Sequence, residues 1–369
     1  MQAKSGIKLL KAMLLLLNIV AIVALEFALL ASHTMPSSTA FLAVFGLFYP
    51  IILFINLFFI LLWILLRSYW AVLSLIFILI GFQNLKNNFP FNFSENDVST
   101  ENSIKVLSYN VQNFGFEISD SAAAKMKQDI ISYVVEKEPD IICFQEFKSR
   151  DKLLYEPLKS LKNELNAESY YFESYFNPRY NEYLTGLAIF SKYDAVNKGK
   201  LKFEGSRTFG IYTDLVINMD TVRVYNIHFA SIQLMQADIG FVVNPDIQNE
   251  KDVKLHFLKI YDKLSAAFRL REKQVAFLVN QIKVCPYEII LCGDFNDPPS
   301  SYTYHEATDF LQDTFVEKGK GMSWSYAGQI PFLRIDYIMK SSGFKTIDYQ
   351  LDKVSFSDHF PVMAILEIN

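Results

Sequence analysis

Charge is distributed very unevenly along this chain of 369 residues, and that distribution limits what the chain can fold into. Residues 1–103 hold five basic and four acidic side chains, whereas residues 104–369 hold 30 basic and 35 acidic ones. A charge-poor beginning and a charge-rich remainder predict an apolar anchor followed by a water-soluble domain of ordinary size. The same distribution excludes a chain that is embedded in a membrane throughout and a chain that is intrinsically disordered.

Two apolar segments in the first part are long enough to cross a bilayer. Ala12–Ala31 is interrupted only by Asn18 and Glu26, and Phe41–Leu66 runs for 26 residues without a charge. At about 1.5 Å per residue, each segment reaches across roughly 30 Å of hydrocarbon. A cleaved signal peptide would also explain the first segment, but the second one directly behind it favours a retained anchor. A third apolar segment, Tyr69–Phe82, has 14 residues and is marginal as a span.

Three lysines before the first segment (Lys4, Lys8 and Lys11) predict a cytoplasmic N-terminus, because positive residues favour the cytoplasmic side. Arg67, which follows the second segment, then also lies inside. If the third segment crosses the membrane, all later residues are extracytoplasmic. If it only lies in the interface, they remain in the cytoplasm.

Two signals disagree on this third segment. Lys86 behind it favours an interfacial segment, whereas the Tyr69-Trp70 pair is typical of the aromatic belt at the end of a true span. We expect three spans, with lipid contact through residues 12–82 and a periplasmic domain on a bacterial inner membrane. No obligate protein partner is inferred.

Composition divides the chain into three parts. Residues 1–83 form the predicted anchor of two to three helices, residues 84–103 are rich in Asn and Ser and predict a linker, and residues 104–369 predict the soluble domain. After residue 104, many short strand-like runs alternate with few helical patterns, as in IKVLSYNV (104–111) and YEIILCGDFN (287–296). This pattern favours an α/β fold, a two-sheet β-sandwich flanked by helices. The helical patterns lie at Ser121–Lys137 and Asp252–Lys283.

Polar side chains stand at the ends of several predicted strands. They are Asn110, Glu146, His228, Asp294 with Asn296, Asp336, and the Asp358-His359 pair. A lone acid at a strand end is more often a turn former or a helix cap, and a buried carboxylate is costly unless it is paired or bound to a metal. Because strands of packed sheets bring their ends to a common rim, six such ends indicate one catalytic cluster.

The chemistry of this set is consistent. Carboxylate and amide oxygens suit Mg²⁺ or Mn²⁺, and the three cysteines, Cys143, Cys285 and Cys292, form neither a zinc-type spacing nor a disulfide framework. Two histidines can carry protons near neutral pH. A hard metal, histidines and amide donors are what the hydrolysis of a phosphate ester requires.

Six motifs occur in an order that resembles the endonuclease/exonuclease/phosphatase (DNase I-like) superfamily. They are LSYNVQNFG around Asn110, PDIICFQEF at Glu146, YNIHFAS at His228, GDFND (293–297), RIDYIM (334–339) and SDHFPV (357–362). The resemblance covers residues 104–368, and the whole chain looks like the membrane-anchored bacterial members. It implies two packed sheets flanked by helices, a single site at one rim, and hydrolysis of phosphate esters.

The resemblance also implies a metal set. Glu146 is expected to be the principal ligand, assisted by Asn110 and by Asp358. Some nucleases of this group carry an acid two residues after the Asn, where this chain has Gln112. That departure favours a single metal ion, Mg²⁺ or Mn²⁺.

The remaining catalytic roles follow from the same resemblance. Asp294 is expected to orient or deprotonate the attacking water, and Asn296 to hold the phosphate. His359 is expected to contact the scissile phosphate, with Asp336 fixing its tautomer. His228 is expected to stabilise the transition state or to protonate the leaving oxygen.

A few cations and one loop lie outside these motifs. Arg207 is a candidate for pairing with a substrate phosphate, although a surface ion pair explains it equally well. Arg179 and Tyr180 are candidates for lining a substrate cleft. The cations of the long predicted helix, among them Arg271, are expected to form a solvated face.

Three functions are compatible with these residues. The first is a membrane-anchored, metal-dependent phosphoesterase that cleaves a phosphodiester in nucleic acid or in a phospholipid-type head group. The alternatives are a phosphomonoesterase and a non-catalytic module that binds a phosphorylated ligand. The acidic charge of the domain weighs against gripping long nucleic acid by bulk charge.

Overall fold

The structure is a computed structural model. It describes residues 2–92, 102–115, 120–149, 155–175, 184–232, 250–328, 330 and 332–369. Five helices come first: α1 (Gln2–Ala31), α2 (Ala40–Leu47), α3 (Tyr49–Leu65), α4 (Ala71–Ile80) and α5 (Phe82–Asn88). Residues 84–88, at the start of the predicted linker, are therefore helical.

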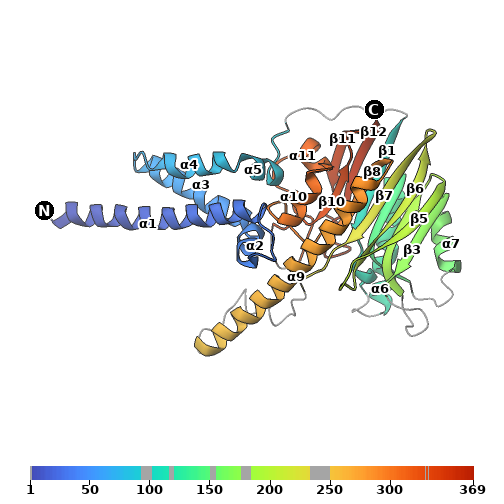
Figure 1. The fold of residues 1–369 in the computed structure, drawn as a ribbon, viewed down its shortest axis with the longest axis horizontal. Helices are drawn as coiled ribbons and strands as arrows, with labels where there is room; N and C mark the ends of the chain where they lie inside the picture. Colours follow the sequence, from blue (N-terminus) through green and yellow to red (C-terminus); the bar gives the residue numbers. More distant parts are fainter. Residues whose placement is uncertain are drawn as a thin grey trace.

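The following part of the chain contains two β-sheets of six strands each, together with the helices that cover them (Figure 1). The first sheet has the order β11 (Phe344–Leu351), β12 (Val362–Ile368), β1 (Ser103–Asn110), β2 (Ile141–Ser149), β4 (Leu184–Ser191), β3 (Ser169–Ser174). The second has the order β5 (Ala195–Lys202), β6 (Phe209–Ile217), β7 (Asp220–His228), β8 (Glu288–Asp294), β10 (Asp336–Lys340), β9 (Gln312–Asp313). The pairs β1–β2 and β7–β8 are parallel, and the other pairs are antiparallel.

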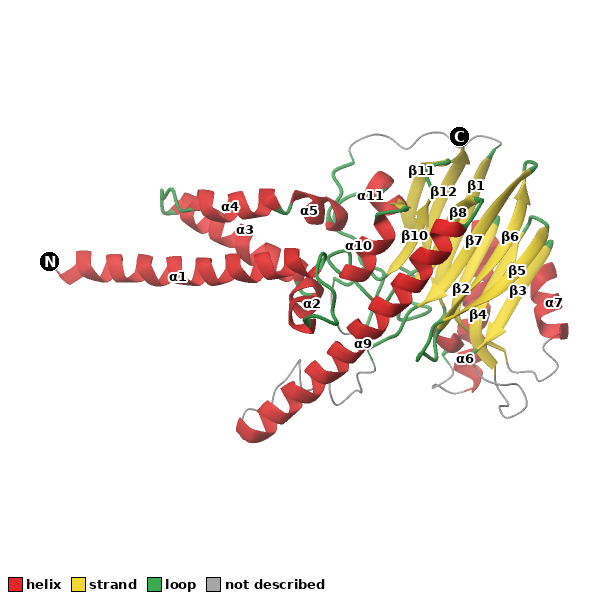
Figure 2. Cartoon of the chain, in the orientation of Figure 1, coloured by secondary structure: helices red, strands yellow, loops and turns green. Residues whose placement is uncertain are grey.

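The sheets pack face to face and are covered by helices on their outer faces, as predicted (Figure 2). Cys143 and Cys292 lie buried, without a disulfide, in the core between the sheets. The first sheet is covered by α6 (Asp120–Lys137) and α7 (Tyr155–Glu164), and the second by α9 (Glu250–Val284) and α10 (Tyr302–Thr308). The small helix α11 (Thr314–Lys318) and the 3₁₀ turn η1 (Gln112–Phe114) complete the described elements.

A buried amide joins the two sheets close to the rim. The Nδ2 of Asn226 on β7 donates to the carbonyls of Phe144 and Ala188 in the opposite sheet, at 2.9 and 3.0 Å. Its Oδ1 accepts from Gln145 at 2.7 Å. Both amides are inaccessible to solvent, so these bonds fix the relative position of the sheets.

The first helices project from one side of the sandwich (Figure 1). Among the described residues, one helix, Gly6–Ala31, is long and apolar enough to cross a membrane by itself. The predicted second span, Phe41–Leu66, is not one straight helix, because α2 and α3 meet at 66°. Pro50 stands at the start of α3, where its missing N–H and fixed φ permit a helix to begin but not to continue from α2.

Polar side chains hold α1, α3 and α4 together. The amide of Asn18 on α1 donates to Ser74 on α4 at 2.6 Å and accepts from the indole of Trp63 on α3 at 2.9 Å. Ser74 in turn donates to Asn56 on α3. All four side chains are fully buried, so these polar groups satisfy one another inside the helical bundle.

The projecting helices are packed directly on the sandwich. Ala40 and Leu47 of α2 are buried against Ile260 and Leu264 of α9. A side chain on Gly46 would meet the carbonyl oxygen of Ser300 at 2.6 Å, so glycine is required for this approach. The first helices and the sandwich therefore share a packed core.

Replacing Asn226 with Ala is expected to destabilise the fold by about 1–3 kcal/mol, because Gln145 and two strand carbonyls lose their buried partner. For a domain of this size, each kcal/mol lowers Tm by roughly 2–4 °C, which a thermal melt of the detergent-solubilised chain measures. Asn280→Ala, at an exposed position of α9, is the matched control and leaves Tm unchanged. Equal melting of both variants contradicts this role for Asn226.

Candidate active site

Strand register brings the predicted polar residues to one rim. In the second sheet His228 on β7 stands opposite Asp294 on β8, and Asp294 stands opposite Asp336 on β10. Asn110 ends β1 in the first sheet, where it is paired with Gln145 of β2. Because β10 runs antiparallel to β8, its first residue lies level with the last residue of β8. Residues far apart in sequence thus become neighbours.

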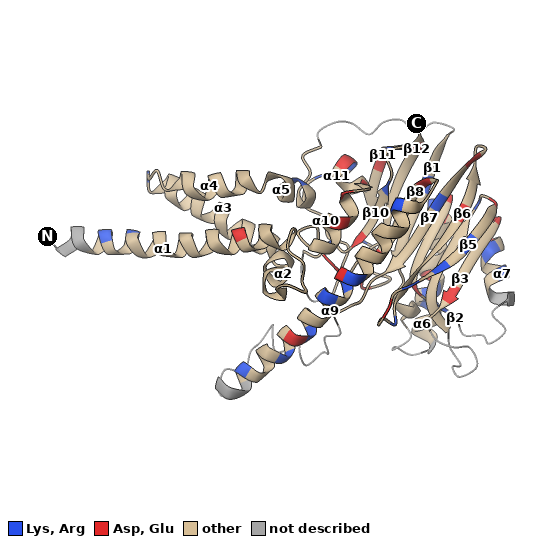
Figure 3. Ribbon diagram, viewed as in Figure 1, with Lys and Arg blue, Asp and Glu red and all other residues tan. Residues whose placement is uncertain are grey.

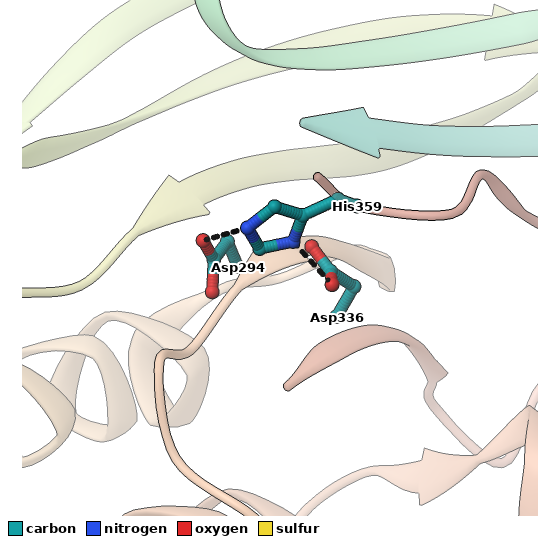
Figure 4. Close-up of side chains that lie close together, drawn as sticks. All are labelled: Asp294, Asp336 and His359. Carbon is teal, nitrogen blue, oxygen red and sulfur yellow. Dashed lines mark hydrogen bonds and ion pairs between the residues drawn. The ribbon is translucent and has the colours of Figure 1, made fainter. Parts of the chain in front are cut away.

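A histidine lies between two buried aspartates at this rim (Figure 4). The Nδ1 of His359 donates to the Oδ2 of Asp336 at 2.8 Å, which leaves Nε2 directed at the Oδ2 of Asp294, 3.9 Å away. The ring of Tyr326 packs edge-on against that of His359, with centroids 5.3 Å apart. The expected hydrogen bond between Asp336 and His359 is therefore present, and the role of Asp336 in catalysis stays a prediction.

The second histidine, His228, faces Asp294 from β7, the strand next to β8. The Nε2 of His228 lies 3.7 Å from Asp294 Oδ2 and 3.9 Å from Glu146 Oε1, and it has no hydrogen-bond partner. Its Nδ1 is 2.8 Å from the hydroxyl of Tyr175. The bond to Tyr175 fixes the ring so that Nε2 points into the site.

Glu146 is held in an unusual backbone conformation. Its φ is +49°, next to an irregularity where the pairing of β2 and β4 shifts between Phe144 and Phe147. Such a bulge re-aims a side chain at the end of a strand. The carboxylate accepts a hydrogen bond from Asn113 at 3.0 Å. The strained backbone of Glu146 is thus the conformation in which its side chain points toward the rim.

Two asparagines and a serine organise the surrounding loops. Asn110 Nδ2 donates to Asp294 Oδ2 at 3.0 Å, and the backbone N–H of Asn296 donates to Asp294 Oδ1 at 2.8 Å. The side chain of Asn296, whose φ is +54°, donates to the carbonyl of Phe229. Ser357, the neighbour of Asp358, donates to the carbonyl of Asn110.

The two histidines have opposite electrostatic environments. Burial disfavours the charged form of His359, but the charges of Asp336 and Asp294 outweigh it and raise its pKa to about 10. Burial, together with the nearby charge of His359, lowers the pKa of His228 to about 4. At neutral pH the site therefore holds one imidazolium and one neutral imidazole.

The acids of the site are crowded. Burial and the charge of Asp336 raise the pKa of Asp294 to about 7. Burial also raises the pKa of Glu146 and that of Asp358, and each of these shifts is increased by a neighbouring carboxylate. Hard oxygen ligands with excess negative charge fit a divalent cation. Ligand atoms of Asp294, Asp336 and His359 also lie within 4.8 Å of one another.

Three residues of the site escaped sequence analysis or were misjudged. Tyr175 and Asn113 orient His228 and Glu146, and Asn113 lies in the same LSYNVQNFG motif as Asn110. Arg271 was wrongly expected on a solvated face. It is fully buried, pairs with Asp297 at 2.9 Å and donates to the carbonyl of Ala230.

The remaining candidates are spread more widely. Arg207 is exposed on the β5–β6 loop and lines a pocket of about 440 Å³ together with Lys263 of α9 and Ala230. Gln274 of α9 donates to Ser206 and Thr208 on either side of Arg207 and accepts from the N–H of Ala230. Arg179 and Tyr180 lie outside the described residues.

Comparison with protein families gives two matches. The model of the Endonuclease/Exonuclease/phosphatase family matches residues 107–359, which include every motif residue from Asn110 to His359. A second model, described as a domain of unknown function, matches residues 11–88. No curated protein matches the chain.

Solved structures of low sequence identity share the fold. The human Nocturnin catalytic domain with bound sulfate anion is 17% identical with a TM-score of 0.52, over 76% of this chain and 100% of that one. The endonuclease/exonuclease/phosphatase from Bacteroides vulgatus is 15% identical with a TM-score of 0.53, over 72% and 99%. D. rerio TDP2 complexed with single strand DNA product is 14% identical with a TM-score of 0.51, over 72% and 100%.

Replacing Asp336 with Asn is expected to lower the pKa of His359 by roughly 1–3 pH units, because the largest stabilising charge is removed. Histidine NMR of the metal-stripped full chain measures this, with Asp220→Asn at the exposed start of β7 as the control. Since the folded-state pKa lies above 6.5, the pair stabilises the fold fully below about pH 6.5, and this is lost as the pH rises through about 10. An unchanged His359 titration in Asp336→Asn contradicts the assignment.

Proposed function

The chain belongs to the Endonuclease/Exonuclease/phosphatase family, and we propose that it is a membrane-anchored, divalent-metal-dependent hydrolase that cleaves a phosphodiester in nucleic acid or in a phospholipid. The observation that carries this proposal is the register of β7, β8 and β10, which sets His228, Asp294 and Asp336 side by side with His359 at one rim. A module that only binds a phosphate ester would not need a buried carboxylate that can accept a proton, together with one charged and one neutral histidine.

Glu146 is proposed to hold the metal ion together with Asn110 and Asp358. Their carboxylate and amide oxygens suit Mg²⁺ or Mn²⁺, and the crowding that raises the pKa of Glu146 and Asp358 supports a cation there. When bound, such an ion supplies polarisation of the phosphoryl oxygen and compensation of its charge.

Asp294 is proposed to orient and deprotonate the attacking water. Its pKa of about 7 suits a general base near neutral pH, and Asn110 and the N–H of Asn296 fix its two oxygens. The proton passes from the water to a carboxylate oxygen of Asp294 as the water oxygen attacks phosphorus.

The histidines then act on the phosphate. His359, kept protonated by Asp336, is proposed to stabilise the negative charge that develops on the phosphoryl oxygens. If Tyr175 donates to Nδ1 of His228, the neutral ring carries its proton on Nε2, which faces the site and is proposed to donate a hydrogen bond that stabilises the charge on the leaving oxygen. Asn296 is proposed to hold the phosphate. Arg207, in its pocket beside Ala230, is proposed to bind an anionic part of the substrate.

Residues 1–83 are proposed to anchor the enzyme in a bacterial inner membrane. Only 28% of the most apolar window of α1 is buried within the molecule, which is unlike the core helix of a soluble protein. The N-terminus and the α3–α4 turn both lie at the end away from the sandwich (Figure 1). Because basic residues near these ends favour the cytoplasm, the catalytic domain is proposed to be periplasmic.

Hydrolysis of an aryl phosphodiester by the full chain in detergent is expected to require Mg²⁺ or Mn²⁺ and to fall by about a hundredfold or more in Glu146→Gln. Glu168→Gln, at an exposed position, is the matched control and retains activity. Cleavage of monoesters alone would identify a phosphomonoesterase. Metal-dependent phosphate-ester binding without turnover of either ester would identify a binding module and contradict catalysis.

A membrane-impermeant maleimide is expected to label Met219→Cys in intact spheroplasts, in a Cys285→Ser background. Met219 is 97% exposed at the β6–β7 turn, so a periplasmic domain presents it outside. Lys8→Cys, near the N-terminus, is expected to react only after permeabilisation. The reverse labelling pattern would place the domain in the cytoplasm.

A further inference from the structure

We propose that the N-terminal end of α9, residues 253–259, is a second membrane contact that docks on an anionic bilayer surface and presents the active site to lipid-borne phosphate esters. We call residues 253–259 the α9 tip. The inference rests on the proposed anchored phosphoesterase and narrows its substrate to phosphate esters carried by lipids.

Helix α9 extends beyond its contacts with the second sheet and with α2. Val275 and Leu278, in its C-terminal half, are buried against the second sheet, and Ile260, Leu264 and Phe268 pack against α2. The α9 tip lies beyond both contacts and projects from the sandwich (Figure 2).

The exposed face of α9 changes composition along the helix. At the α9 tip it carries Leu255, Phe257 and Leu258, whose side chains are 54%, 55% and 48% exposed. Between residues 262 and 273 the exposed positions are Asp262, Ala266, Arg269 and Lys273. This stretch is thus typical of a helix in water, whereas large apolar side chains on adjacent exposed positions are typical of a contact surface.

The α9 tip lies where the anchor enters the bilayer. It projects on the same side of the sandwich as α1, and along the long axis of the molecule it lies level with the C-terminal half of α1 (Figure 1). A membrane that covers the exposed apolar surface of α1 therefore meets the α9 tip at its interface with water.

Charge at the α9 tip matches a lipid surface. Lys254 and Lys259 flank the exposed leucines, and both are exposed; Figure 3 shows further basic residues along the projecting half of the helix. Apolar side chains between lysines bind the headgroup region of anionic membranes, where each adds to the affinity. This combination favours a bilayer over an apolar protein partner.

The same geometry places the active site next to the membrane. Ser300, four residues after Asn296 and six after Asp294, accepts a hydrogen bond from Asn88 of α5 and lies against Gly46 of α2. Two residues before Asp336, Arg334 donates to the carbonyl of Asn87. The segments that carry the catalytic acids are therefore the segments that hold the anchor, so the nearest phosphate esters are those of lipids.

The first test measures where the α9 tip lies. Spin-labelled Leu258→Cys in the full chain, reconstituted in nanodiscs with roughly 30% anionic lipid to give a negatively charged surface, is expected to show high accessibility to oxygen and low accessibility to a water-soluble nickel chelate. Val196→Cys on β5, 63% exposed on the sandwich, is the matched control and is expected to show the reverse. High accessibility of position 258 to the nickel chelate shows a tip that is free in water and overturns the proposal. Low accessibility to both reagents shows a tip that is covered by protein and overturns it as well.

The second test measures the consequence for substrate. The double variant Leu255→Glu/Leu258→Glu is expected to hydrolyse a soluble aryl phosphodiester at the wild-type rate. Its hydrolysis of phospholipid in vesicles is expected to fall by roughly tenfold or more. Loss of the burial of one leucine side chain already changes a binding constant by that ratio. Equal rates on vesicles for the variant and the wild type overturn the lipid inference. If the wild-type chain hydrolyses neither the soluble ester nor phospholipid in vesicles, the proposed function itself is overturned.

Discussion

The burial of the Asp294 carboxylate between two histidines is the interaction on which the site depends. Water cannot solvate this group, so its charge is balanced by an imidazolium on one side and by amide donors on the other. Asp336 supplies the charge that keeps His359 protonated, while His228 stays neutral under the same burial. Each group therefore has the protonation state that its neighbours impose, and the polar bonds between the sheets keep those neighbours in place.

The buried strands were predicted well from sequence, because an apolar run that ends in a polar motif has one interpretation in a packed sheet. Strand β5 is hard to recognise from sequence, because its residues AVNKGKLK are mostly exposed at the edge of the second sheet and show no apolar alternation. Strands β3 and β11 lie at the edges of the first sheet. Edge strands pack on one side only, so their sequences carry a weaker signal.

The polar details of the site are harder to predict, because they depend on contacts between distant segments. Nothing in the sequence around Arg271 distinguishes it from Arg269 and Lys273, yet only Arg271 faces the loop that carries Asp297. The left-handed backbone of Glu146 depends on how β2 pairs with β4. Likewise, the break between α2 and α3 follows from Pro50, but the packing of α2 on α9 is visible only in three dimensions.

The close contact between Gly46 and Ser300 has a consequence for how the enzyme searches for substrate. A domain on a flexible tether samples a range of heights and orientations above a membrane. Here the backbone of α2 lies against the loop that follows β8, and Asn87 and Asn88 of α5 bond to neighbouring segments. If the first helices lie in a membrane, as proposed, the candidate site is thus kept at one height and one tilt above it, and lateral diffusion, rather than tumbling of the domain, would deliver a lipid-borne ester to Asp294.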